Sequence, residues 1–114
     1  MVGALSDHPA AGVSPHLVEL TQDVLFGDVW ERPQLSKRDR SIATVAVLIA
    51  KFRTDELRSH LNRALDNGVT EDEIGELICH LAFYGGWPAA ASAVNVARQV
   101  FEERAATSAP EPQE

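Results

Sequence analysis

The segment that decides the fold runs from Leu35 to Pro88 and reads LSKRDRSIATVAVLIAKFRTDELRSHLNRALDNGVTEDEIGELICHLAFYGGWP. Its apolar residues recur every three or four positions, which is typical of helices that bury one face. Nowhere does the chain alternate apolar and polar residues with the period of two that indicates a strand. The segment therefore predicts an all-α fold.

Helix-start and helix-stop signals divide this segment. Small polar residues that cap an N-terminus mark helix starts, whereas glycine marks helix ends and proline marks a restart. In chain order, the signals are Ser36 with Asp39, Thr54, Asn67 with Gly68, Thr70 with Glu73, Gly85 with Gly86, and Pro88. Thr70 and Glu73 have the spacing of a capping box. The signals predict four helices with short connections.

Outside this segment the sequence predicts one more helix and two irregular ends. Ser14 and Pro15 open a helix with an apolar stripe made by Leu17, Leu20, Val24 and Leu25. Residues 1–13 are expected to form a flexible N-terminal arm, because they are small and contain proline and glycine. Residues 105–114 are expected to form a disordered acidic tail. The five predicted helices form one small domain over residues 14–104.

Size and charge limit the classes of function. A chain of 114 residues, 45% of them hydrophobic, is expected to form one domain with a modest core. Its net charge of -7 provides no basic surface, which argues against binding to nucleic acid or to an anionic membrane. The apolar runs are too short to span a bilayer, and no signal peptide is visible, so a cytoplasmic location is expected.

The only cysteine, Cys79, leaves no internal disulfide and no CxxC redox pair. His80 follows it directly, and adjacent helical residues point about 100° apart, so the two are poorly placed as nucleophile and base. A metal ion held by His60, His80 and Glu56 would lack any local ligand motif. The sequence therefore predicts no metal and no cofactor.

Glu56 and His60 are the leading candidates for chemistry. They are four residues apart, so both side chains project from one face of a helix and can hydrogen-bond. A carboxylate there would hold the imidazole in one tautomer and raise its pKa, which suits a proton shuttle near neutral pH. The alternative is an exposed pair with no role in chemistry.

Three further positions are candidates for binding a substrate. Arg40 lies one turn inside a largely apolar helix, and its planar guanidinium suits a carboxylate. Tyr84 and Trp87 flank two glycines, in a turn that can line a pocket, close a helix–helix corner, or do both. Trp30, in the linker before Pro33, either covers a pocket or packs two helices together.

Three ordered segments, WERPQLSKRDRS, ELRSHLNRALDNGVTEDEI and FYGGWPAAASA, resemble the carboxymuconolactone decarboxylase family of the alkylhydroperoxidase D-like superfamily. The resemblance covers residues 26–101. It implies an all-α, alkylhydroperoxidase D-like fold that assembles as a homotrimer or homohexamer. It also implies a cofactor-free carboxy-lyase that releases CO2 from a small carboxylated lactone or oxo acid in the catabolism of aromatic compounds.

The resemblance also assigns roles by position. His60 would be the catalytic acid and base, Glu56 would orient it, and Arg40 would bind the substrate carboxylate. The residues that would contact the rest of the substrate are Tyr84, Trp87, Trp30 and His80.

The chain departs from the family pattern in two places. The peroxidase branch carries a CxxC pair where this chain has Arg53 and Glu56, which argues against peroxide reduction by that pair. The decarboxylase branch often has a cysteine and a small apolar residue where this chain has Gly85 and Trp87, so another lactone or oxo acid fits equally well. The alternative functions are a non-catalytic oligomeric binding or scaffold protein and a peroxide-reducing enzyme that uses Cys79.

Overall fold

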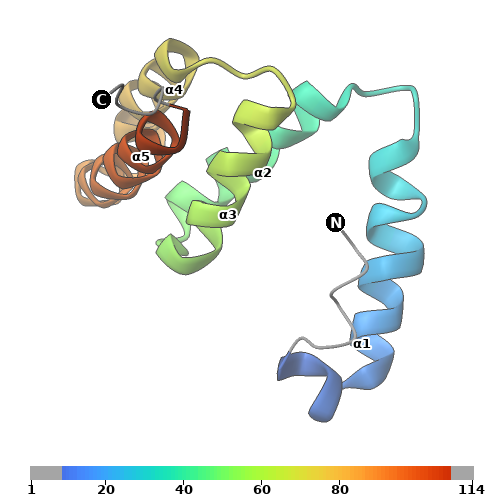
Figure 1. Cartoon of the computed structure of the whole chain (residues 1–114). Helices are drawn as coiled ribbons and strands as arrows, with labels where there is room; N and C mark the ends of the chain where they lie inside the picture. The colour runs from blue at the N-terminus through green and yellow to red at the C-terminus, as the bar shows by residue number, and fades with distance from the viewer. Residues whose placement is uncertain (1–8, 109–114) are drawn as a thin grey trace, which may run out of the picture. The chain divides into compact units, whose positions relative to one another are not determined.

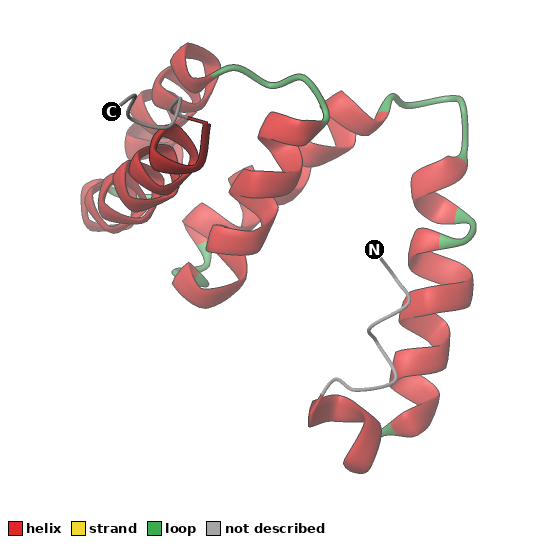
Figure 2. Ribbon diagram, in the orientation of Figure 1, coloured by secondary structure: helices red, strands yellow, loops and turns green. Residues whose placement is uncertain are grey.

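The computed structural model describes residues 9–108, and residues 1–8 and 109–114 lie outside the described part. Every regular element in residues 9–108 is helical, and no strand occurs among them (Figures 1 and 2). The predicted all-α fold with five α-helices is confirmed. The chain forms two compact units, one up to Lys37 and one from Arg38 onward. This boundary falls inside the segment 14–104 that the sequence predicts to be one domain.

The first unit is built from short helical segments. They are the 3-10 helix η2 (Pro9–Gly12), α1 (Pro15–Leu20), the π-helix η3 (Thr21–Phe26) and the 3-10 helix η4 (Val29–Glu31). Ser14 occupies the N-cap position of α1 and Pro15 opens the helix, as predicted. The predicted first helix changes to π geometry at Thr21 and ends at Gly27. Of the predicted arm, residues 1–8 lie outside the described part and residues 9–12 form η2.

The second unit contains the four helices predicted for the central segment and its continuation. They are α2 (Lys37–Ala50), α3 (Thr54–Asp66), α4 (Glu71–Tyr84) and α5 (Trp87–Ser108), and α5 packs against both α3 and α4. Residues 105–108 of the predicted disordered tail continue α5, because two alanines favour the helix and Thr107 Oγ1 donates to the Glu103 carbonyl. The rest of the tail lies outside the described part.

A single buried cluster holds the second unit together. Its members from α2, α3 and α4 are mostly large aliphatic residues, whereas α5 contributes mainly alanines that allow close helix approach. They are Val45, Ile49, Leu57, Leu61, Ala64, Val69, Ile74, Ile78, Ala89, Ala90, Ala93, Ala97 and Val100. The cluster fixes how α3 is oriented, and α3 carries Glu56 and His60.

Only one side of α2 is buried. Val45 and Ile49 are in the core, whereas Ala50 is exposed and Val47 is 54% exposed. Ser41 is also buried, and its hydroxyl accepts a hydrogen bond of 3.0 Å from Asn67 Nδ2 at the end of α3. A buried hydroxyl is acceptable there because it is hydrogen-bonded.

The local signals around α3 and α4 are confirmed with one correction. Gly68 has a φ of 98°, the left-handed conformation that ends α3, and Thr70 and Glu73 form both hydrogen bonds of the predicted capping box. The N-cap of α3 is Arg53 and not Thr54. The prediction failed because Thr54 is already inside the first helical turn, where its hydroxyl is no longer at the capping position.

This difference between the two threonines can be measured. We expect Thr70→Ala to lower the free energy of unfolding by about 1 kcal/mol, because the backbone N–H of Glu73 loses the Thr70 hydroxyl that accepts its hydrogen bond. The matched substitution Thr54→Ala should cost clearly less. Urea denaturation followed by circular dichroism measures both values, and equal losses would contradict the assignment of the caps.

None of the helices in residues 9–108 has the length and apolar character needed to cross a membrane.

Candidate functional site

His60 lies at the edge of the buried face of α3. Leu57, Leu61 and Ala64 on the same helix are almost fully buried, and they anchor α3 to the core. His60 is one turn beyond Leu57 and one turn before Ala64, so its ring is half-buried and its Nδ1 atom is shielded from solvent. An imidazole in such a place is held by the helix yet is within reach of the surface.

Glu56 has a partner that the sequence analysis did not predict. Its Oε1 atom accepts a hydrogen bond of 2.6 Å from Arg53 Nε, one turn earlier on α3. The carboxylate still influences His60, because its negative charge raises the pKa of the imidazole. Arg53, one turn before Glu56, offers this carboxylate a charged donor. The CxxC positions of the peroxidase branch are thus occupied here by an ion pair.

The net shift in the pKa of His60 is opposite to the predicted one. Burial is the largest cause and lowers the pKa, the positive charge of Arg63 lowers it further, and the charge of Glu56 opposes both. The result lies below the ordinary value of 6.5. The prediction of a raised pKa was wrong because it counted the carboxylate and missed both the burial and Arg63.

The electrostatics of His60 lead to a pH-dependent prediction. Because its pKa is lowered on folding, the unfolded chain binds more protons than the folded chain as the pH falls through 6.5. We therefore expect His60 to destabilise the fold progressively as the pH falls from 6.5 toward the folded-state pKa. Above pH 6.5 this contribution vanishes.

NMR titration of the imidazole resonances checks the cause of this shift. Arg63→Gln should raise the pKa of His60, and Glu56→Gln should lower it further. Arg58→Gln removes the same charge from α3, but Arg58 bonds Glu103 and Gln99 on α5, so it should change the pKa of His60 less. A native pKa above 6.5 would contradict the electrostatic description.

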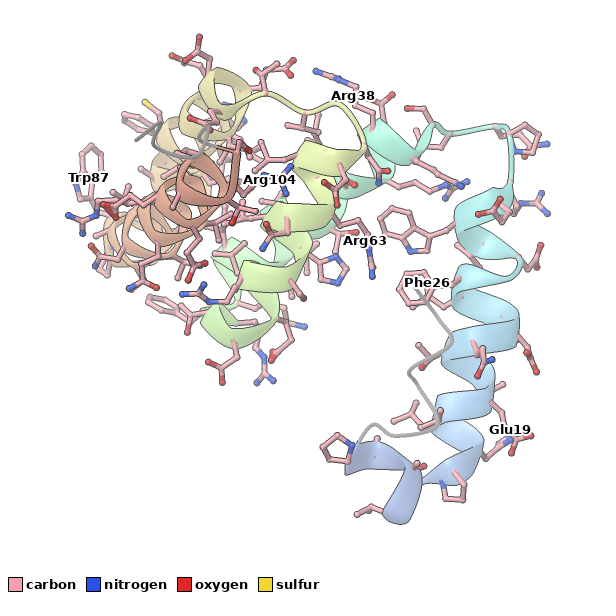
Figure 3. All side chains as sticks on the ribbon, viewed as in Figure 1. Glu19, Phe26, Arg38, Arg63, Trp87 and Arg104 are labelled. Carbon is pink, nitrogen blue, oxygen red and sulfur yellow. The ribbon has the colours of Figure 1, made fainter. Side chains whose placement is uncertain are left out.

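Arg63 is the site residue that sequence reasoning did not single out. It is half-buried on α3 three residues after His60, and it projects from that helix in Figure 3. Burial lowers the pKa of its guanidinium, although the group stays charged. The sequence could have indicated Arg63 by its spacing of three residues from His60, which places the two side chains on one face of the helix.

The predicted anion clamp, Arg40, is half-buried on α2, and its carbonyl accepts a hydrogen bond of 2.8 Å from Thr44 Oγ1. Its role in binding a carboxylate stays a prediction. Trp30 belongs to the first unit, where it is buried and its ring centroid lies 6.0 Å from that of Phe26. Its role as a cover for the substrate also stays a prediction.

The aromatic turn between α4 and α5 is an exposed corner of the second unit. Tyr84 is 80% exposed and Trp87 is 66% exposed. The ring centroids of His80 and Tyr84 are 4.8 Å apart. The rings of Phe83 and Trp87 meet edge to face, with their centroids 5.6 Å apart. A Cβ atom at Gly85 would lie 3.3 Å from Ala50, so the glycine allows close backbone approach. The turn therefore closes a helix–helix corner, and substrate contact by these residues stays a prediction.

Three surface hollows occur in the second unit, and none of the three is lined by His60. One of about 350 Å³ lies at the ends of α3 and α5 and is lined by Asn62, Glu103, Arg104, Thr107 and Ser108. The other two, of about 300 and 270 Å³, adjoin along α4 and α5 and share Gly75, Ile78 and Val94. We call these two the α4–α5 groove. The remaining residues that line it are Ile74, Cys79, Ala82, Trp87, Ala90, Ala91, Ala97, Arg98, Phe101 and Glu102.

Within residues 9–108, no group of three histidine, cysteine or acidic side chains is arranged to hold a metal ion. Cys79 is a free and exposed thiol on α4. Its neighbour His80 is also exposed, and its ring contact is with Tyr84. Along α3, Glu56 bonds Arg53, and the charges of Glu56 and Arg63 both act on His60.

Comparison with known proteins adds to this geometry. Residues 15–99 match the model of the carboxymuconolactone decarboxylase family. A 4-carboxymuconolactone decarboxylase from Acinetobacter baylyi is 49% identical over 78 residues, which are 68% of this chain and 58% of that protein. The nitrosuccinic acid decarboxylase npaB from Metarhizium robertsii is 36% identical over 85 residues, 75% of this chain and 59% of that protein. The chain thus spans less than two thirds of the length of either relative.

Proposed function

This chain belongs to the carboxymuconolactone decarboxylase family, and on that premise we propose that it is a cofactor-free carboxy-lyase that releases CO2 from a small carboxylated lactone or a related acid. The observation that carries the proposal is its similarity to two relatives that are both named as decarboxylases. We assign the proton transfer to His60, which lies in the region that matches the family model.

The two relatives' names describe substrates with a common chemical feature. Each has a carboxylate and also a group, a lactone or a nitro group, that can accept an electron pair. In such a reaction the bond from carbon to the carboxylate breaks, CO2 leaves, and the electron pair moves toward the accepting group. A proton must then be delivered to carbon, so the reaction needs a general acid and no redox partner.

His60 suits the proton delivery because it is half-buried beside charged groups on a rigid helix. Because its pKa is lowered, the imidazole of His60 is mostly neutral at pH 7 when no substrate is bound. An anionic substrate would favour the protonated imidazole by its charge, and the ring would then return that proton to carbon. Glu56 contributes a negative charge that acts in the same direction.

The remaining assignments rest on the family resemblance. Arg40 would bind the substrate carboxylate, and Trp30 would cover the substrate. Tyr84, Trp87 and His80 would line its binding site. Because the two aromatic residues are largely exposed in one chain, such a site would need a second copy of the chain to close it. We therefore include a homotrimer or homohexamer in the proposal.

The α4–α5 groove is the surface where we expect the second copy. Its walls are almost entirely apolar, and monomeric proteins rarely expose such continuous patches. Arg98 and Glu102 lie one turn apart on its margin, so two grooves related by a two-fold axis could place opposite charges against each other.

Sedimentation equilibrium measures this association. We expect the native chain to sediment as an oligomer and Val94→Arg to dissociate it, because the substitution places a charge inside the groove. Val47→Arg is the matched control, since Val47 on α2 is 54% exposed and Val94 is 49% exposed. Dissociation by Val47→Arg, with Val94→Arg still assembled, would move the interface to α2.

The experiment that tests the activity uses the purified native chain. CO2 release and ultraviolet absorbance are followed with 4-carboxymuconolactone and, separately, with nitrosuccinate. We expect turnover of at least one of the two without an added metal or cofactor. If neither substrate nor related lactones and nitro acids release CO2, the chain is a non-catalytic member of the family, and the lyase proposal is wrong.

A further inference from the structure

We propose that Phe52 of one chain enters the α4–α5 groove of a second copy over Gly75, and that the second copy makes the same contact in the opposite direction. This inference rests on the self-association included in the proposed function, and it names the anchor and the hollow that receives it. Two residues carry it, because each is locally unfavourable in a single chain.

Phe52 follows α2 in a backbone conformation that suits glycine. Its φ is 58°, and its N–H donates to the carbonyl of Ile49 at 3.1 Å, while the N–H of Arg53 donates to that of Leu48 at 2.9 Å. This is a helix C-cap whose left-handed position is usually a glycine, and any side chain is strained there. The ring is nevertheless 52% exposed. Contacts within its own chain therefore compensate the strain only in part.

Gly75 shows the opposite mismatch. It lies inside α4, where glycine is less stable than alanine or glutamine. Apart from its chain neighbours and its own helix backbone, no described atom lies within 4 Å of the place that a Cβ atom would take. Crowding in its own chain therefore does not require a glycine. Gly75 lines both hollows of the α4–α5 groove, so its missing side chain leaves room for a group from outside the chain.

The place of Phe52 suits a reciprocal contact. The turn between α4 and α5 lies against the end of α2, since a Cβ atom at Gly85 would be 3.3 Å from Ala50. Trp87, just after this turn, lines one end of the groove. Phe52, two residues after Ala50, is thus attached near the Trp87 end. Two grooves that run antiparallel about a two-fold axis would place Phe52 of each chain at the other end of the second groove.

The hollow at that other end fits such an anchor. Its volume is about 300 Å³, and its walls are apolar apart from Arg98 and Glu102 at the margin. An aromatic side chain gains most from burial in such a place. Lys51 is exposed next to Phe52 and would face Glu102, whereas Arg98 bonds Asn95 on its own helix at 2.7 Å. In a chain with a net charge of -7, a basic residue at the contact also reduces the repulsion between copies.

Sedimentation equilibrium of the full chain measures the association. Phe52→Ala should raise the dissociation constant of the assembly by about 30-fold, as removal of an aromatic anchor does. Gly75→Gln fills the hollow with a polar side chain and should raise the constant by at least about tenfold. Val47→Ala shortens an exposed side chain outside the groove and should change it by less than about twofold.

Urea unfolding separates an anchor from a residue that serves only its own fold. The comparison is made in the Val94→Arg background, which is expected to keep the chain monomeric. Phe52→Gly removes the strain and Gly75→Gln adds a better helix former, so each should raise the folding equilibrium constant about two- to fivefold. Both substitutions would then stabilise the single chain and weaken the assembly. Phe52→Gly that destabilises the monomer would overturn the inference.

A double-mutant cycle locates the contact. Phe52→Ala and Val94→Ala should together weaken association by less than the product of their separate effects, because both remove parts of one contact. Phe52→Ala and Val47→Ala should act independently. Independent effects of Phe52→Ala and Val94→Ala would overturn the inference, as would full association in Phe52→Ala.

The state of assembly and the turnover are measured separately, so this inference and the lyase proposal can fail independently. A native chain that releases CO2 as a monomer would support the lyase and overturn the contact made by Phe52. Assembly that depends on Phe52 and Gly75, in a chain that turns over no acid, would support the contact and reject the lyase.

Discussion

His60→Gln is expected to lower kcat for CO2 release by about 100- to 10,000-fold, the range by which a positioned general acid accelerates a reaction. Glutamine keeps a polar side chain of similar reach but cannot deliver a proton at neutral pH. Because His60 is half-buried on α3 and its neighbours Leu57 and Leu61 are unchanged, the variant should fold as the native chain does. The measurement is kcat from the CO2 assay.

A second histidine provides the control. His16 lies in the first unit and is largely exposed, with its Nδ1 atom 4.0 Å from Glu19. His16→Gln makes the same chemical change and is expected to leave kcat within about twofold of the native value. If His60→Gln turned over at the native rate, another group would have to return the proton to carbon. The assignment of His60 would then be wrong, even with the lyase activity established.

Val45→Ala is expected to lower the free energy of unfolding by about 2 kcal/mol, from two lost methyl groups and the cavity that they leave. Val45 is fully buried at the contact between α2 and the core. The expected loss is a large fraction of the stability of a small domain. Urea denaturation, with the linear extrapolation to zero urea, measures the change.

Val47 on the same helix is the matched control, since it is 54% exposed. Val47→Ala is expected to change the free energy of unfolding by less than about 0.5 kcal/mol. A loss as large as that of Val45→Ala would show that the outer face of α2 is covered in solution. It would then contradict the choice of the α4–α5 groove as the surface of self-association.

The sequence by itself determined the features that depend on short stretches of chain. Helix periodicity, the Thr70–Glu73 capping box and the left-handed Gly68 were all predicted and are all present. These signals succeed because the groups that satisfy each other are three or four residues apart, so no distant contact is needed. Family membership could be recognised for a similar reason, because three ordered segments carry it. Thr54 marks the limit of such signals, since a shift of one residue moves the cap to Arg53.

Only the tertiary structure decided the partners and the environment of the charged groups. Spacing allowed Glu56 to pair with His60 and also with Arg53, and it did not reveal the ion pair that Glu56 forms with Arg53. The pKa of His60 fell because packing against the core removes water from the ring, an effect that spacing does not reveal. Burial of one side of α3, exposure of the Tyr84 corner and the place of Arg63 depend likewise on how the helices pack. Burial and exposure are set by contacts between helices that are distant in sequence.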